Sequence, residues 1–132
     1  MKPLIYLSVL LISIMFVWCE QILKKPNNEG TPEIVFESLE HDFGKIPVGE
    51  KVSYNFKFKN TGSGTLIIRS VETSCGCTVP KYKKRPIPPG GKGNLKVILD
   101  SSEKAGPQLN TIEITSNAFK TVMVLIIKAE VI

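Results

Sequence analysis

The chain has 132 residues and a formal net charge of +5. About 100 residues remain once an N-terminal apolar run and the polar stretch behind it are set aside, which is enough for one domain with a single core and too few for two. The positive excess is modest, so it indicates at most a local surface for an acidic partner.

The first nineteen residues resemble an export signal. An apolar run extends almost without interruption from Leu4 to Trp18, after Lys2 and before Cys19. It is shorter than the roughly 20 residues that a membrane-spanning helix needs. We therefore expect a signal peptide over residues 1–19 that ends at Cys19, a candidate for lipidation. Because the large Trp18 makes a poor lipobox, an uncleaved anchor and a cytosolic chain are the alternatives.

Residues 20–32 carry little to bury, so we expect a tether there and a domain over residues 33–132. The first strand of this domain is expected at residues 33–39. Residues 51–59 alternate strictly between apolar and polar side chains, which is typical of a half-buried strand. Turn residues at positions 60–64 end this strand, and a further strand is expected at residues 65–71.

The second half of the domain continues this pattern. Prolines in residues 86–91 cannot donate ladder hydrogen bonds, so this stretch separates two elements. Strands are expected at residues 94–99, 108–116 and 121–132, and the last is apolar on both faces, as in a covered strand. Six or seven strands without a convincing amphipathic helix predict an all-β sandwich.

Several motifs follow one another along the domain: His41-Asp42-Phe43-Gly44-Lys45-Ile46, Gly49, Phe56 to Gly62, Leu66-Ile67-Ile68, Ser74-Cys75-Gly76-Cys77-Thr78, Pro89-Gly90 and Ser116-Asn117. In this order they resemble a bacterial family, the domain-of-unknown-function family numbered 1573, and the resemblance covers nearly everything from Val35 onward. It implies an immunoglobulin-like sandwich related to the domains called ASPM, SPD-2, hydin, and more loosely to major sperm protein. It also implies export, often as a lipoprotein of Bacteroidetes-type bacteria, and it brings no established activity.

Cys75 and Cys77 are two thiols separated only by Gly76, a residue that can take backbone angles closed to others. In an oxidising compartment such a pair can form a disulfide, bind a soft ion such as Cu or Zn, or pack as two thiols. His41, the only imidazole in the chain, is the natural third metal ligand. Its alternative is a strand-end residue whose ring hydrogen-bonds to the backbone, with Asp42 capping a turn.

Other residues of the motifs have plain structural interpretations. We expect Phe43 to fill a corner of the sandwich and Gly44 to let the chain bend between sheets. Asn60 and Gly62 are expected to form a turn, with a positive φ at Gly62.

A basic run, Lys81, Tyr82, Lys83, Lys84 and Arg85, is the candidate partner-binding surface. We expect it in a loop over residues 73–85 that places it beside the cysteine turn, and such a run can meet an acidic lipid head group or a polyanionic glycan. Tyr82 stands where the resembling proteins often have tryptophan, so the preference of this surface can differ. A solvated loop is the alternative.

No catalytic constellation is recognisable, because His41 and Asp42 are neighbours in an expected strand and their side chains would point to opposite faces. We therefore expect no enzyme and no required cofactor. The sequence favours an exported, lipid-anchored binding module in the periplasm or at the cell surface, with an envelope protein or glycan as partner and no nucleic acid. A thiol-based metal or redox carrier and a purely structural envelope component are the alternatives.

Overall fold

The computed structural model describes residues 5–12, 30–103 and 105–132. Residues 5–12 form a short helix. Among the described residues, no helix is both long and apolar enough to cross a membrane. Cys19 and most of the expected tether lie outside the described residues, so their assignments stay predictions.

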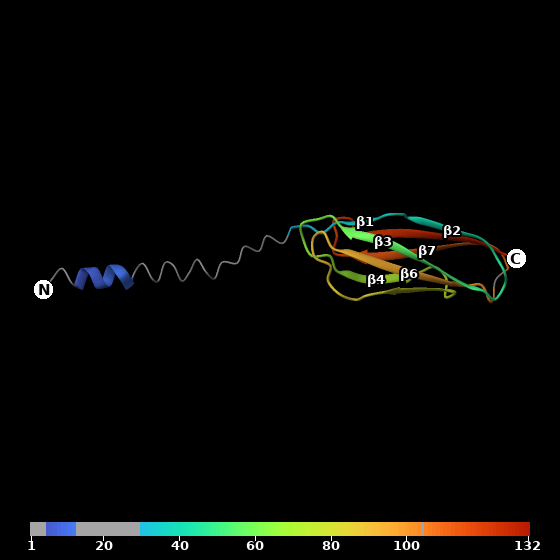
Figure 1. Cartoon of the computed structure of the whole chain (residues 1–132), viewed down its shortest axis with the longest axis horizontal. Helices are drawn as coiled ribbons and strands as arrows, with labels where there is room; N and C mark the ends of the chain where they lie inside the picture. The colour runs from blue at the N-terminus through green and yellow to red at the C-terminus, as the bar shows by residue number, and fades with distance from the viewer. Residues whose placement is uncertain (1–4, 13–29, 104) are drawn as a thin grey trace.

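The domain is a sandwich of two four-stranded sheets (Figure 1). One sheet has the order β1-β3-β6-β5, and the other has the order β2-β8-β7-β4. The strands are β1 (Ile34–Phe36), β2 (Glu40–Ile46), β3 (Lys51–Asn60), β4 (Ile68–Thr73), β5 (Thr78–Tyr82), β6 (Lys92–Asp100), β7 (Gly106–Ser116) and β8 (Val122–Val131).

The described residues thus hold eight strands, where about seven were expected, and the differences lie at β2 and β5. The first expected strand, residues 33–39, corresponds to β1, and β2 is an additional strand beyond it. The chain leaves the first sheet after Phe36, and β2 pairs in parallel with β8 in the second. The expected loop over residues 73–85 is wrong at Thr78–Tyr82, which pairs with β6 as an edge strand. The sequence did not indicate this strand because Pro80 argues against a central strand. A proline is tolerated at a sheet edge, which is where β5 lies.

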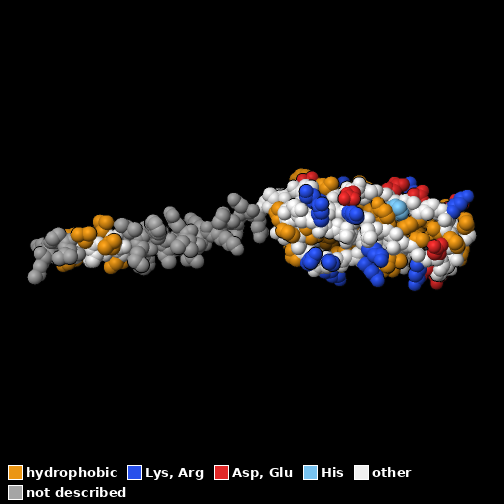
Figure 2. Space-filling view, in the orientation of Figure 1, with side chains coloured by type: hydrophobic (Ala, Val, Ile, Leu, Met, Phe, Trp, Pro, Cys, Tyr) orange, Lys and Arg blue, Asp and Glu red, His pale blue; other side chains and the backbone are white. Residues whose placement is uncertain are grey.

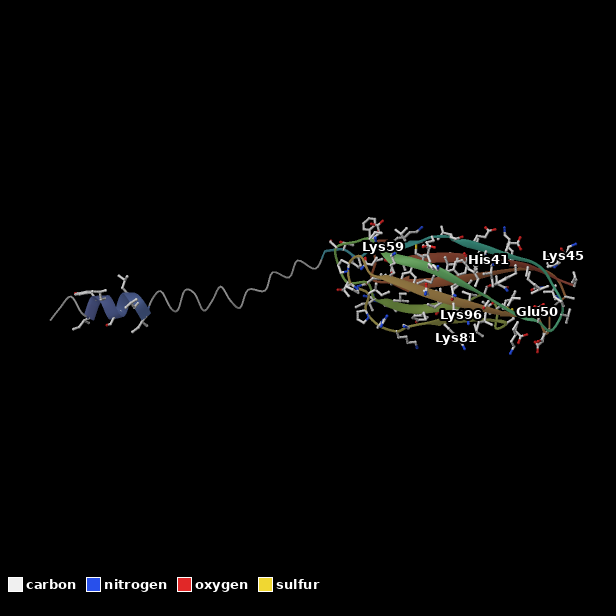
Figure 3. The ribbon with its side chains drawn as sticks, in the orientation of Figure 1. His41, Lys45, Glu50, Lys59, Lys81 and Lys96 are labelled. Atoms are coloured by element: carbon white, nitrogen blue, oxygen red, sulfur yellow. A yellow bond between two sulfur atoms is a disulfide. The ribbon has the colours of Figure 1, made fainter. Side chains whose placement is uncertain are left out.

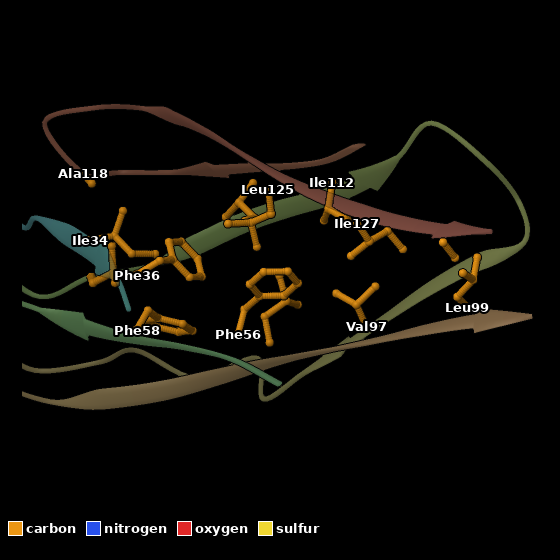
Figure 4. Packing of buried hydrophobic residues seen from close by; sticks show 14 of the residues in the cluster. Ile34, Phe36, Phe56, Phe58, Val97, Leu99, Ile112, Ala118, Leu125 and Ile127 are labelled. Carbon is orange, nitrogen blue, oxygen red and sulfur yellow. The ribbon is translucent and has the colours of Figure 1, made fainter. Parts of the chain in front are cut away.

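Alternating apolar residues from both sheets form one core (Figure 4). Phe56, Val97, Ile112 and Leu125 are at most 1% exposed. Inward-facing residues from two aligned sheets fill the space between them, as the strict alternation at residues 51–59 predicted. The buried hydrophobic cluster lies wholly between Ile34 and Val131, so the segment from residue 30 to 132 contains a complete core.

Asn60 is a buried hydrogen-bonding centre at one end of this core. Its amide nitrogen donates to the carbonyl oxygens of Gly64 (2.8 Å) and Ile87 (3.0 Å). Its side-chain oxygen accepts from the backbone N–H groups of Glu33 (3.2 Å) and Gly62 (3.1 Å). One side chain therefore joins the start of β1, the turn after β3 and the connection before β6.

The two motif glycines act in different ways. Gly44 has a φ of +70° at a register shift between Asp42 and Lys45, so it bends the chain inside β2. The expected bend between the two sheets was wrong at this residue, because β2 stays within one sheet. Gly62 has no positive φ, and that expectation was wrong. The backbone of residues 31–33 runs so close to Gly62 that a Cβ would overlap it, and close approach is therefore the reason for this glycine.

Candidate functional site

The basic run occupies the C-terminal end of the edge strand β5 and the connection that follows. Lys81 is exposed on β5, and the side chain of its neighbour Tyr82 is half-buried. In the antiparallel pair, Lys81 lies opposite Lys96 and Tyr82 lies opposite Leu95. Figure 3 shows Lys81 and Lys96 close together. A second strand thus adds to the positive charge that the sequence assigned to a loop.

A groove opens where β5 ends. β6 begins three residues before the partner of Tyr82, and in the described register these three residues pair with β3 only. The chain after Tyr82 leaves the sheet, so it forms a wall beside the uncovered part of β6. This basic groove is lined by Phe58, Lys81, Tyr82, Lys83, Arg85, Ile87, Lys92, Gly93, Asn94 and Lys96.

Gly93 shapes the floor of the basic groove. A Cβ at this position would overlap the ring of Phe58, which is 4% exposed and packs in the core. The glycine therefore lets a large aromatic ring close the core directly beneath the open edge of β6. The floor at Gly93 therefore carries no side chain of its own.

Positive charge is not compensated within the basic groove. Five of its lining residues are cationic and none is acidic. Among the described residues, the ion pairs are Lys51–Asp100 and Lys128–Glu40, and neither includes a groove residue. Lysine and arginine side chains are spread over this face of the molecule in Figure 2. The arrangement attracts an anion, and the lysines raise the local concentration of negatively charged partners.

A second depression, on the other sheet, has a different character. It is lined by residues of β2, β7 and β8, and its charged members are Asp42, Lys45, Lys128 and Glu130. Lys128 is paired with Glu40, and the hydrogen bond that its ammonium donates to the Glu40 carboxylate raises the pKa of Lys128. The two acidic and two basic side chains of this depression balance each other. It is therefore the weaker candidate for binding a charged partner.

The cysteine turn lies at the opposite end of β5. Cys75 and Cys77 are joined by a disulfide. The N–H of Cys77 donates to Sγ of Cys75 (3.2 Å), and the amide of Asn110 lies 3.7 Å from Sγ of Cys77. The length of β5 separates this turn from the basic groove by about 16 Å. The expected juxtaposition of the turn and the basic run was therefore wrong.

The surroundings of the disulfide are acidic. Asp100 and Glu103 line the same depression as Cys75 and Cys77. Hydrogen bonds from Ser102, first from its hydroxyl and then from its N–H, hold the pKa of Asp100 below its ordinary value. A thiolate formed by reduction would face these carboxylates, and like charges disfavour it.

His41 is not brought together with the cysteines. It lies on β2 at one edge of its sheet, whereas the cysteine turn follows β4 at the other edge. Two strands lie between them, which corresponds to roughly 14 Å. Figure 3 likewise shows His41 and Lys81 at opposite edges of the sandwich. Within the described residues, no three His, Cys, Asp or Glu side chains are placed to hold a metal ion.

The ring of His41 belongs to an aromatic cluster. It stacks on Tyr54 with a centroid distance of 3.7 Å and meets the edge of Phe43 at 4.7 Å. Among the described residues, the ring of His41 makes these aromatic contacts and not the expected hydrogen bond to the backbone. Asp42 is exposed and accepts the N–H of Gly44 at 2.8 Å, as expected for a residue that caps a local turn. The partly buried Phe43 packs against the core.

Sequence reasoning missed Lys92, Gly93, Asn94 and Lys96 as groove residues. Their polar positions alternate along β6 as in any solvent-facing strand, so the local pattern carries no functional signal. Only the register of β5 against β6 places Lys96 opposite Lys81. A prediction that residues 78–82 pair with residues 95–99 would have placed Lys96 beside the basic run.

The chain is similar to one described protein family and to several solved structures. The sequence model of a family described as "Protein of unknown function (DUF1573)" matches residues 34–131. A crystal structure of a protein of unknown function from Porphyromonas gingivalis W83 is similar, with a TM-score of 0.70 and 23% identity. That alignment covers 82% of this chain and 50% of the other, so the chain spans half of that protein's length. No curated protein matches the chain.

Two further structures show the same fold. The ASH/PapD-like domain of human CEP192 (PapD-like domain 7) has a TM-score of 0.64 and 10% identity, over 83% of this chain and 93% of the other. The secreted serine protease VesC from Vibrio cholerae has a TM-score of 0.59 and 10% identity, over 75% of this chain and 23% of the other. The first likeness confirms the expected immunoglobulin-like sandwich fold.

Proposed function

Since the chain belongs to the DUF1573 family, whose description states no function, we propose from the geometry that it is a binding module of a bacterial cell envelope. The module is exported and lipid-anchored through Cys19, and it binds an envelope protein or glycan through the basic groove. An immunoglobulin-like sandwich is compatible with this role, because such folds bind through edge strands and end loops.

One observation carries the proposal: the groove at the end of β5 collects five cations and no acid from two separate segments of the chain. A solvated loop would not require this convergence. Opposed lysines on neighbouring strands also lower stability, and this cost suits a surface that meets an anionic partner.

The experiment is cosedimentation of the segment 30–132 with cell-envelope fractions of the source organism. Saturable binding is expected for the wild type, with a strong loss in a Lys81→Gln/Lys96→Gln variant. A Lys45→Gln/Lys120→Gln variant removes the same charge from exposed positions outside the groove and should bind as the wild type does. Equal binding by both variants would contradict a role of the groove.

A thiol carrier is the second candidate, and the half-exposed disulfide with two N–H donors directed at its sulfur atoms favours it. Intact mass, thiol titration and metal content of periplasmic material distinguish the two functions. A reducible disulfide with full envelope binding after Cys75→Ser/Cys77→Ser substitution supports the binding module. Loss of envelope binding in that variant, together with a stoichiometric soft metal in the wild type, supports the carrier.

A further inference from the structure

The cations of the basic groove follow a spacing that one small ion cannot satisfy. Lys81 and Lys96 lie directly opposite each other on the neighbouring strands β5 and β6, at a Cβ separation of about 5 Å. Lys92 and Lys96 lie on the same outer face of β6, about 13 Å apart along the strand. Arg85 adds a planar guanidinium that can hold a carboxylate, sulfate or phosphate through two hydrogen bonds. Several anionic groups on one extended chain would fit this row.

The floor of the basic groove adds groups that suit a sugar ring. Tyr82 packs one side of its ring against the core and also lines the groove, where it contributes an aromatic ring with a phenolic hydroxyl. Asn94 contributes an exposed amide with donors and an acceptor. Gly93 adds no side chain to this lining. A pyranose ring could pack on Tyr82 while its hydroxyl groups hydrogen-bond to Asn94.

Two other classes of anionic partner fit less well. A peptide that adds a strand gains its affinity from main-chain hydrogen bonds. At the groove end of β6, β5 leaves just three residues uncovered, Lys92, Gly93 and Asn94. A membrane surface is bound by inserted apolar side chains together with cations. The apolar lining residues Phe58 and Ile87 are 4% and 7% exposed, so they have nothing to insert.

We propose that the basic groove binds a linear anionic polysaccharide. Its sulfates or carboxylates pair with Lys81, Arg85, Lys92 and Lys96, and one of its rings packs on Tyr82. This inference rests on the proposed function and names the chemistry of the partner. Because the contacts are largely ionic, the affinity falls as salt is raised.

The test is isothermal titration calorimetry on the segment 30–132 with a size-defined heparin oligosaccharide as the probe. Neutral dextran, anionic phosphatidylglycerol vesicles and poly-glutamate are the comparison ligands. We expect the oligosaccharide to bind most tightly and the Lys81→Gln/Lys96→Gln variant to lose about tenfold in affinity. The Lys45→Gln/Lys120→Gln control should change less than about twofold, since exposed charges outside the site act only at long range.

Substitutions of Tyr82 test whether its aromatic ring contributes to binding in addition to the positive charges. Tyr82→Leu should weaken binding of the oligosaccharide, whereas Tyr82→Phe, which keeps the ring, should retain most of it. Thermal unfolding of each variant shows that the sandwich is intact. An equal affinity of Tyr82→Leu and the wild type, or an equal loss in the groove variant and the control variant, would overturn the proposal.

The comparison ligands separate the inference from the proposed function. Tighter binding of vesicles or poly-glutamate would overturn the polysaccharide assignment and leave a binding groove for another anion. Absence of polysaccharide binding with cosedimentation still dependent on Lys81 and Lys96 would overturn the inference alone. Absence of both would overturn the proposed function as well.

Discussion

Lys81 on β5 and Lys96 on β6 occupy directly opposed positions in an antiparallel pair, so two ammonium groups share one row of the sheet's outer face. Like charges in this arrangement repel each other through solvent. We predict that Lys96→Gln raises the free energy of unfolding by about 0.5 kcal/mol at low salt. Urea denaturation at low and high salt measures this change.

Salt should abolish most of that gain, since surface charge interactions are screened. Lys51→Gln is the matched control, because Lys51 lies 3.8 Å from Asp100 and loses an attraction in place of a repulsion. A gain for Lys51→Gln as large as that for Lys96→Gln would show that net charge alone, and not the opposed pair, sets the effect.

Asn60→Ala should cost about 3 kcal/mol of unfolding free energy, because it leaves buried backbone groups without partners. The side chain of Asn60 is fully buried and makes four hydrogen bonds to backbone atoms. Asn55→Ala, at an exposed position of the same strand, should stay within about 0.5 kcal/mol. Similar costs for the two variants in chemical denaturation would refute the assigned role of Asn60.

Gly93→Ala should destabilise the domain by about 2 kcal/mol, because the added methyl group forces the ring of Phe58 from its place. Gly76→Ala is the matched control. Gly76 has no positive φ, and nothing lies within 4 Å of a Cβ built there, so alanine should be tolerated. Thermal unfolding measures both, and a neutral Gly93→Ala would contradict the packing described for the floor of the groove.

Reduction of the Cys75–Cys77 disulfide should lower the free energy of unfolding by only about 1.5 kcal/mol, because the bond closes a very short loop. The buried cluster does not include Cys75, and Cys77 packs against it only in part, so the fold should persist. Denaturation of the wild type with and without reductant, and of Cys75→Ser/Cys77→Ser, measures this effect. Global unfolding on reduction would show that the turn is essential to the sandwich.

Asp100 should contribute a pH-dependent part of the stability. Its pKa is lowered in the folded state, first by the hydroxyl and then by the N–H of Ser102. A lowered carboxyl pKa means that this stabilisation is present above the unfolded-state value and is lost as pH falls through the folded value. Ser102→Ala should move the pKa back toward 3.8, as an NMR titration of the Asp100 carboxyl will show. An unchanged titration would refute the assigned cause.

The sandwich could be predicted from the sequence because its signals are local. The alternation at residues 51–59 marks the inward residues of β3, and Asn60 and Gly62 mark its end. Family motifs added the immunoglobulin-like class. Within β5, however, Pro80 and a short length hid an edge strand, so residues 78–82 were expected in a loop.

The basic groove could be predicted only in part, because half of it depends on strand pairing. Lys81 and Arg85 stand in a visible basic run, but Lys92 and Lys96 join them through the register of β6. The same limit applies to His41, which the sequence allowed as a partner of the cysteines. Sheet order places β2 and β4 at opposite edges, and no local pattern reveals that order.

The most direct measurement is an NMR titration of the isotope-labelled segment 30–132 with the anionic oligosaccharide. We expect the largest shifts of backbone amides at Tyr82, Arg85, Gly93 and Asn94, and no shifts for the amides of β2 and β8. Shifts concentrated on β2 and β8, or at the cysteine turn, would contradict the claim that the chain binds its partner through the basic groove.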